Sequence, residues 1–293
     1  MKYRKLEGTD LTVPQYVLGT GDYASNVPAD IARDLLKTYV DCGGTMLDTS
    51  HYYGSFLVGG RSLSECLVGD FLQENHLREQ VLISTKGCCY ATNKPYEKRM
   101  TPAFLRSDLT ESLRNLHTDY IDFYWLHQDD PSQPVGAILE ELNRCVEEGK
   151  IRYFGCSNWK IERILEADAY AEAHGLRKFS ANQVMLNMAY PNMTAVDELI
   201  QTWLTPGMRK YHERTQRPVF AYCSQASGFF YNCFKDDYME NIGYSYSRKY
   251  FYNSESLRRA KQALRLSKQS GMTLQDIVLG YTLAQPFLSL IHI

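Results

Sequence analysis

The sequence predicts an α/β fold, a (β/α)₈ barrel preceded by a β-hairpin. Short apolar runs alternate with longer amphipathic segments along the 293 residues. Seven of these strand–helix units begin between residues 17 and 219, at intervals of about 34 residues, as expected for βα units of a parallel sheet. No linker or shift of composition divides the chain, and a barrel of this type needs about 250 residues.

The predicted strands follow a hairpin within residues 2–15, which turns around Glu7–Asp10. Each strand is a short apolar run bounded by polar or glycine residues. In chain order the strands are Val17–Gly19, Met46–Asp48, Val81–Ser84, Ile121–Leu126, Tyr153–Cys156, Ala181–Val184 and Val219–Ala221.

The predicted helices between the strands have apolar residues at helical spacing. The clearest stripes contain Ile31, Leu35, Leu36, Tyr39 and Val40, then Leu105, Leu109, Leu113 and Leu116, then Val135, Ile138, Leu139, Leu142 and Val146. Thr101-Pro102 and Ser62–Glu65 have the pattern of helix starts, and Gly43 follows a helix end. Two more helices are expected at 254–268 and 273–284.

The end of the chain departs from a complete barrel. We expect one domain over residues 1–287, with the last strand and helix incomplete, and a non-native tail at residues 288–293. The tail, Leu288-Ser289-Leu290-Ile291-His292-Ile293, is what CTG TCT CTT ATA CAC ATC encodes, a string that resembles a transposon end used in sequencing adapters. The alternative is a natural β-strand, because the segment is apolar enough to form one.

A doubly wound sheet is the alternative fold. It would need a glycine-rich phosphate loop after an early strand, and the sequence has no G-x-G-x-x-G motif. Gly19-Thr20-Gly21 is only the opening of such a motif and indicates little by itself.

The composition argues against several partners. The 32 basic and 34 acidic residues give a net charge of −2, which removes the electrostatic argument for nucleic acid or an anionic membrane. No apolar run is long enough to span a membrane, and no secretory signal is visible at the start. The eight cysteines form no C-x-x-C pair, so we expect a reducing, cytoplasmic location without disulfides.

Four residues at successive strand ends are candidates for catalysis. Asp48 ends the second strand, Tyr53 follows it, Lys86 ends the third strand and His127 ends the fourth. Each also has an ordinary structural explanation when taken alone. Asp48 could cap the next segment, Tyr53 could be one of many structural tyrosines, Lys86 could be a solvated strand end, and His127 could be a hydrogen-bonded strand-end histidine. Their joint placement favours a site, because active groups of a barrel gather at the carboxyl ends of its strands.

These four residue types suit proton donation to a carbonyl oxygen. A free tyrosine has a pKa of about 10, and an adjacent lysine ammonium is expected to lower that pKa by favouring the phenolate. Asp48 could hold the lysine, and a neutral His127 could orient the carbonyl. None of these groups is a hydride source, so a cofactor would have to supply the hydride.

The motifs in this order resemble the aldo-keto reductase family. They are Gly44-Thr45-Met46-Leu47-Asp48-Thr49-Ser50-His51-Tyr52-Tyr53-Gly54, Ser84-Thr85-Lys86, Leu126-His127-Gln128-Asp129-Asp130-Pro131, Gly149-Lys150-Ile151-Arg152-Tyr153-Phe154-Gly155-Cys156-Ser157-Asn158 and Asn182-Gln183. The resemblance runs from about Lys2 to Phe287.

The resemblance implies reduction of a small-molecule aldehyde or ketone by NADPH, with NADH not excluded. It implies Tyr53 as proton donor, Asp48 and Lys86 as its tuning pair, and His127 as the orienting group. It also implies that Ser157, Asn158 and Gln183 hold the carboxamide of the cofactor. In the same way it implies that Tyr222 stacks on the nicotinamide ring, and that the segment containing Cys223, Ser224 and Gly228 covers the pyrophosphate. That segment departs from the family's commoner Tyr-Ser-Pro-Leu form. The basic loop that grips the 2′-phosphate in the family is not recognisable here.

Two other function classes remain open at this point. One is a nicotinamide-binding sensor or regulatory subunit with little turnover, which the intact set of four residues argues against. The other is a metal-dependent barrel hydrolase using His51, His127, Asp129 and Asp130. The sequence lacks an H-x-H after the first strand and shows no clear ligand spacing, so no metal site is predicted.

Overall fold

A computed structural model describes residues 1–55, 61–90, 99–195, 201–287 and 289–292. Its strands are β1 (Tyr3–Lys5), β2 (Thr12–Pro14), β3 (Tyr16–Gly19), β4 (Met46–Asp48), β5 (Leu82–Gly87), β6 (Ile121–Leu126), β7 (Ile151–Ser157), β8 (Asn182–Met185), β9 (Val219–Tyr222) and β10 (Ser289–His292). The last eight form a closed barrel in the order β10-β3-β4-β5-β6-β7-β8-β9, which confirms the predicted fold class.

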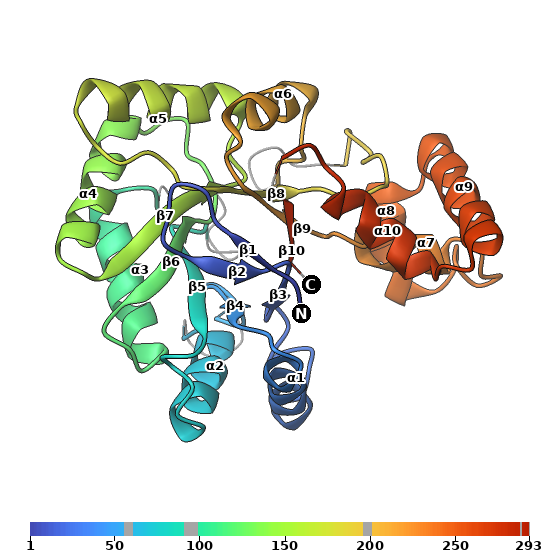
Figure 1. The fold of residues 1–293 in the computed structure, drawn as a ribbon, viewed down its shortest axis with the longest axis horizontal. Helices are drawn as coiled ribbons and strands as arrows, with labels where there is room; N and C mark the ends of the chain where they lie inside the picture. The colour runs from blue at the N-terminus through green and yellow to red at the C-terminus, as the bar shows by residue number, and fades with distance from the viewer. Residues whose placement is uncertain (56–60, 91–98, 196–200, 288, 293) are drawn as a thin grey trace. The chain divides into compact units, whose positions relative to one another are not determined.

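The helices follow the strands as expected for a (β/α)₈ chain (Figure 1). They are α1 (Ala29–Asp41), α2 (Leu63–Glu74), α3 (Pro102–Asn115), α4 (Val135–Glu147), α5 (Ile161–Ala173), α6 (Pro206–Thr215), α7 (Phe229–Asn232), α8 (Ser245–Phe251), α9 (Ser254–Ser270) and α10 (Leu274–Leu283), with short 3₁₀ turns at Ala226–Gly228 and Ile242–Tyr244. By contacts the chain divides into two compact units, Met1–Asn182 and Gln183–Ile293.

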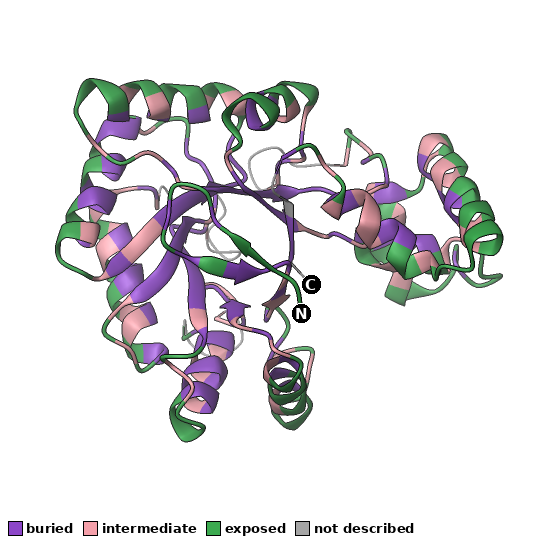
Figure 2. Ribbon diagram, viewed as in Figure 1, coloured by how far each residue is buried: buried purple, intermediate pink, exposed green. Residues whose placement is uncertain are grey.

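The first unit contains the hairpin, β3 to β7 and helices α1 to α5. β1 and β2 pair antiparallel, with Tyr3 opposite Pro14, so the predicted hairpin is confirmed. From β3 to β7 each strand pairs in parallel with the next. The helices of this unit lie outside these strands, and the purple of Figure 2 shows that β4, β5 and β6 are almost entirely buried.

The second unit has its own aromatic core. Buried residues from the region after β9 pack together here, among them Phe229, Phe230, Tyr238 and Phe251. These residues account for part of the tyrosine- and phenylalanine-rich stretch of the sequence. β10 pairs in parallel with β9, with Leu290 opposite Phe220, where we expected a non-native tail. The pairing does not reveal the origin of these residues, and residues 288 and 293 lie outside the described part.

Helix starts follow the sequence signals closely. Thr101 caps α3 by accepting a hydrogen bond from the Phe104 N–H, with Pro102 at the first helical position. Ser62 caps α2 by accepting from the Glu65 N–H at 3.2 Å, but the Glu65 carboxylate bonds to Thr85 and Asn115. The spacing of Ser62 and Glu65 is that of a capping box, of which only the Ser62 half is formed.

The apolar stripe of α1 is rotated from the predicted one. Ala32, Leu36 and Tyr39 are buried, whereas Ile31 and Leu35 are 50% and 45% exposed. A helix over a barrel strand buries a narrow stripe, so apolar residues at its edge remain in solvent. The expectation that all five apolar residues share the buried face is wrong for these two.

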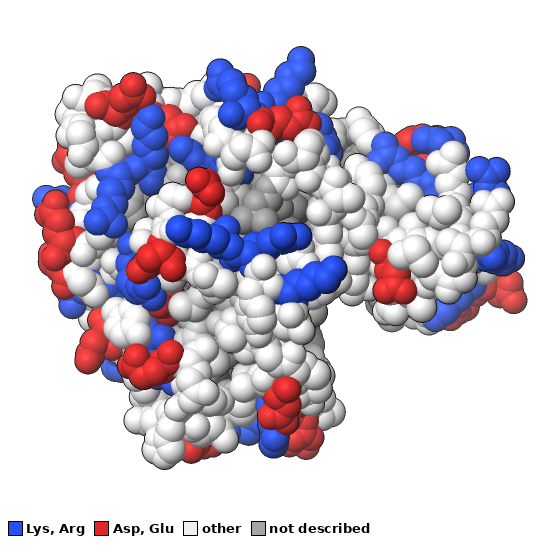
Figure 3. Space-filling view, in the orientation of Figure 1, with Lys and Arg blue, Asp and Glu red and all other residues white. Residues whose placement is uncertain are grey.

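The surface charges match the near-neutral composition. Acidic and basic side chains both appear on the visible surface of each unit in Figure 3. No helix in the described residues is long and apolar enough to cross a membrane.

Candidate active site

The buried pair Asp48 and Lys86 is the centre of the candidate site. Asp48 ends β4 and lies opposite Ser84 of β5 in the strand register. Lys86 is two residues beyond Ser84, so both side chains point to the same face of β5. The Lys86 ammonium donates to the Asp48 carboxylate and, at 2.7 Å, to the Thr49 carbonyl. Both side chains are almost completely buried, at 1% and 0% exposure.

The charge of Lys86 is maintained by its neighbours. Burial alone would lower the pKa of Lys86, but the charge and hydrogen bond of the Asp48 carboxylate help to raise that pKa above the usual value. Lys86 is therefore held as an ammonium, and Asp48 supplies the opposite charge that a buried cation requires.

A second hydrogen-bonded chain supports Asp48 from the opposite side. The Ser84 hydroxyl donates to the Asp48 carboxylate at 2.5 Å and accepts from the Trp125 indole N–H at 2.7 Å. Trp125 lies opposite Lys86 in the β5–β6 register. Sequence reasoning missed Ser84 and Trp125. The available signal was the i, i+2 spacing of Ser84 and Lys86, which places both on one strand face.

Tyr53 lies in the loop after β4, against Lys86. The Lys86 ammonium is 4.8 Å from the centre of the Tyr53 ring, and the Tyr53 and His127 rings meet edge to face at 5.8 Å. A Cβ built on Gly21 would lie 3.8 Å from the Tyr53 ring, so the chain before α1 also lines this ring. The structure thus brings together Asp48, Tyr53, Lys86 and His127, as the sequence analysis expected.

The pKa of Tyr53 differs from the expectation. Burial raises the pKa of Tyr53 above its usual value of 10.0, and although the Lys86 charge and hydrogen bond lower it, they do not reverse the increase. Lys86 therefore acts on the pKa of Tyr53 in the predicted direction, but the effect of burial is larger. The sequence indicates which charge is adjacent, but the cost of desolvation depends on the surrounding packing.

His127 is held on both sides at the end of β6. Its backbone N–H donates to the Gly87 carbonyl at 2.9 Å, and its ring Nδ1 lies 3.0 Å from the Ser50 hydroxyl. Ser50 is fully buried and also accepts from the Tyr52 N–H at 3.1 Å. Ser50 is a third residue that the sequence analysis did not single out.

Ser157 and Asn158 lie at the carboxyl end of β7, next to His127. The Asn158 amide donates to the His127 carbonyl at 3.0 Å and to the Ser157 hydroxyl at 3.2 Å. Asn158 has a left-handed φ of 60°, which asparagine tolerates better than most residues. The N-cap of α5 is Lys160, so this pair does not cap that helix. Amide and hydroxyl groups here have the donor and acceptor chemistry that a carboxamide requires.

The remaining predicted cofactor residues belong to the second unit. Gln183 is buried in β8, and Tyr222 ends β9 with its hydroxyl donating to the Thr202 carbonyl at 3.4 Å. Cys223 has a left-handed φ of 51°, and Ser224 is 2% exposed. Gly228 has a φ of 75°, a conformation that glycine adopts without strain. The backbone after β9 therefore turns sharply through left-handed residues.

Metal ligation finds no support in the described residues. That part of the chain contains no group of three or more histidine, cysteine, aspartate or glutamate side chains that could hold a metal ion. His51 instead approaches the carboxylates of Glu111 at 2.8 Å and Asp108 at 3.8 Å.

Comparison with known families decides the classification. The model of the aldo/keto reductase family matches residues 16–291. This chain belongs to the aldo/keto reductase family. The match ends within β10 and agrees with the barrel.

Individual reductases show how far the similarity extends. Aldo-keto reductase YhdN of Bacillus subtilis is 29% identical over 181 residues, 60% of this chain and 53% of that protein. Norsolorinic acid reductase of Aspergillus flavus is 30% identical over 174 residues, 57% of this chain and 42% of that protein. The aligned part thus spans about half of these curated relatives.

A solved aldo-keto reductase structure has the same fold. It is Tm1743 in complex with the inhibitor epalrestat, with a TM-score of 0.73 and 23% identity, covering 100% of this chain and 89% of that one. At this identity the likeness supports the fold alone.

Proposed function

We propose that this aldo/keto reductase reduces a small-molecule aldehyde or ketone to an alcohol with NAD(P)H. The observation that carries the proposal is that the Tyr53 ring lies 4.8 Å from the buried Lys86 ammonium and meets the His127 ring edge to face. The family match and the reductase names of its relatives support the same reaction class. None of its eight cysteines, all within the described residues, forms a disulfide, which supports a reducing, cytoplasmic location.

A nicotinamide cofactor, when bound, supplies the hydride for this reaction. Ser157 and Asn158 have the polar groups to hold its carboxamide together with Gln183. Tyr222 has an aromatic ring to cover one face of the nicotinamide, and Cys223, Ser224 and Gly228 form the backbone turn proposed to approach the pyrophosphate. NADPH is the cofactor that the family resemblance suggests, and NADH is the alternative.

The residues of this chain supply the proton and the orientation. Because its pKa is raised, Tyr53 is a protonated phenol near neutral pH and can donate that proton to the carbonyl oxygen. The phenolate left behind faces the Lys86 ammonium, which Asp48 holds in place. The proposal requires the ring proton of His127 on Nε2, which leaves Nδ1 to accept a hydrogen bond from the Ser50 hydroxyl.

The test is Tyr53→Phe, which removes only the proton-donating hydroxyl. We expect kcat to fall by about 10²–10⁴-fold, the usual contribution of general acid catalysis, with cofactor affinity nearly unchanged. Turnover is measured with NADPH and with NADH over a panel of carbonyl compounds, and affinity by cofactor titration.

Tyr120→Phe is the matched control, because it removes a tyrosine hydroxyl at the other end of the same strand. Tyr120 directly precedes β6, whereas His127 of the proposed site directly follows it. That variant is expected to keep wild-type turnover. Equal loss of turnover and cofactor affinity in Tyr53→Phe would contradict the assigned role. A wild type that binds cofactor tightly but turns over no carbonyl would instead favour the sensor or regulatory class.

A further inference from the structure

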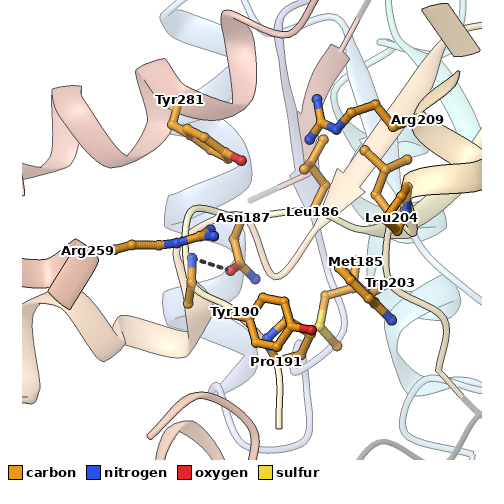
Figure 4. A pocket seen from close by; sticks show the side chains of 12 residues that line it. Met185, Leu186, Asn187, Tyr190, Pro191, Trp203, Leu204, Arg209, Arg259 and Tyr281 are labelled. Atoms are coloured by element: carbon orange, nitrogen blue, oxygen red, sulfur yellow. Dashed lines mark hydrogen bonds between the residues drawn. The ribbon is translucent and has the colours of Figure 1, made fainter. Parts of the chain in front are cut away.

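The second unit contains a cavity that none of the predicted catalytic or cofactor-binding residues lines. It has a volume of about 370 Å³ and lies between the loop after β8 and helices α6, α9 and α10 (Figure 4). That volume is within the range of small-molecule pockets. None of its 12 lining residues belongs to the site proposed above.

One side of the cavity is aromatic. Tyr190 and Trp203 meet edge to face with their ring centres 5.6 Å apart. Trp203 is placed by a parallel bridge to Met185 at the end of β8, and the Leu204 N–H donates to the Met185 carbonyl at 2.9 Å. Trp203 is thus tied to the barrel, whereas the Tyr190 backbone bonds to Ser256 of α9, and the two rings offer an aromatic corner to a ligand.

The polar side of the cavity is cationic. Arg209 of α6 and Arg259 of α9 enter it from opposite sides in Figure 4, with the Tyr281 hydroxyl pointing inward. No aspartate or glutamate is among the lining residues. Two guanidinium groups without a carboxylate in the same wall are an arrangement that attracts an anion.

Neither arginine is fully neutralised by the described residues. Arg209 donates to the neutral side-chain oxygen of Gln285, and no described carboxylate forms an ion pair with it. Arg259 bonds to Glu255 at 2.7 Å, but that carboxylate also bonds to Arg258 at 2.8 Å. The two arginines lower the pKa of Glu255 to about 2, and one positive charge of this cluster remains uncompensated.

We propose that this cavity binds an organic anion with an aromatic body and a carboxylate. The aromatic body would pack against Trp203 and Tyr190, and the carboxylate would bond to Arg209 and Arg259. Arginine suits this role because its planar donors match the two oxygens of a carboxylate. This site does not depend on the proposed reductase activity.

The test uses 3-phenylpropionate, with 3-phenylpropionamide as its uncharged counterpart. Trp203 reports on binding, because it is half-buried in the cavity wall whereas Trp125 and Trp159 are 0% exposed. We expect a saturable change of tryptophan fluorescence, with the acid binding at least about tenfold more tightly than the amide. Trp203→Phe is expected to abolish the signal, and Tyr53→Phe to leave the affinity unchanged.

The arginine variants locate the anion contact. Arg209→Gln is expected to weaken 3-phenylpropionate binding about tenfold, and Arg209→Lys to weaken it less because the charge remains. Arg214→Gln is the matched control, since Arg214 is an exposed residue of the same helix outside the cavity. Equal affinity for acid and amide would overturn the proposal. So would equal effects of the Arg209→Gln and Arg214→Gln substitutions, or the absence of saturable binding.

Discussion

At the scale of single residues, Ser84 connects the candidate site to the barrel core. Its hydroxyl donates to Asp48 and accepts from the Trp125 indole. Asp48 in turn holds Lys86, so the orientation of the ammonium next to Tyr53 depends on a buried chain of four side chains. In such a chain each removed partner leaves a buried polar group unsatisfied.

Ser84→Ala is expected to destabilise the protein by about 1–3 kcal/mol, because the Trp125 N–H loses its acceptor and Asp48 loses a donor. The free energy of unfolding in urea measures this cost. The double variant Ser84→Ala/Trp125→Phe provides the control, since it removes both partners of one hydrogen bond. Its cost should be smaller than the sum of the single variants by about 0.5–3 kcal/mol. Additive costs would show that the bond contributes nothing.

The positions of Asp48, Lys86 and His127 were predictable from the sequence, because each ends an apolar run of recognisable length. The supporting residues Ser50 and Ser84 were not singled out, since serines are common and only the strand register shows which of them meet a catalytic group. The net pKa change of Tyr53 was also beyond the sequence, because it depends on how much water the fold removes.

At the scale of elements, Glu65 joins α2 to its neighbours inside the protein. Its carboxylate accepts from Thr85 of β5 at 2.6 Å and from Asn115 of α3 at 3.1 Å. Burial raises the pKa of Glu65 above its usual value of 4.5, despite these hydrogen bonds and the nearby His51. The Thr85 side chain points to the opposite face of β5 from those of Ser84 and Lys86. Ser84 and Lys86 therefore contact Asp48 in the candidate site, whereas Thr85 contacts Glu65 of α2.

The raised pKa of Glu65 predicts a pH-dependent contribution to stability. An acid whose pKa is raised in the folded state binds its proton more tightly there than in the unfolded chain. Its stabilisation is present below the usual value of 4.5 and is lost as pH rises through the folded pKa. Relative to Glu65→Gln, which cannot ionise, the wild type should therefore lose stability as pH rises.

Urea unfolding of both proteins at about pH 4.5 and about pH 7 measures the difference between their free energies of unfolding. A wild-type advantage that is the same at the two pH values, or larger at the higher one, would contradict the assigned direction.

Strand β7 requires a glycine for close packing. A Cβ built on Gly155 would lie 2.5 Å from the Ala181 carbonyl oxygen and 2.6 Å from the Trp125 ring. Gly155→Ala is expected to destabilise the protein by about 1–3 kcal/mol through overpacking. Gly280→Ala in α10 is the contrasting variant, because nothing lies within 4 Å of its Cβ. It should stabilise the protein by about 0.5–1 kcal/mol. Thermal unfolding compares the two, and a neutral Gly155→Ala would contradict the packing.

At the scale of the whole molecule, β10 closes the barrel with residues that we predicted to be a non-native tail. An apolar segment with β-forming residues can pair with an open strand edge whatever its origin. The strand and the predicted origin are therefore compatible, and the origin remains a proposal.

Reading the source DNA past the codon for Phe287 tests this proposal. We expect the natural gene to diverge from Leu-Ser-Leu-Ile-His-Ile and to continue into a strand, a basic loop and a helix. A natural gene that encodes these six residues followed by a stop would contradict it. If the gene does continue, the longer protein should be assayed with NADPH and NADH, because the added loop bears on the preference between them.

The sequence by itself determined the order of elements, the barrel class and the residues at its strand ends, because hydrophobic periodicity and strand-end polarity are local patterns. Tertiary structure decided which side chains meet. The register of β4, β5 and β6 brings Ser84 and Trp125 to Asp48 and Lys86, and burial sets the pKa of Tyr53. The cationic cavity likewise joins residues from α6, α9 and α10, which are distant in sequence, and only packing brings them together.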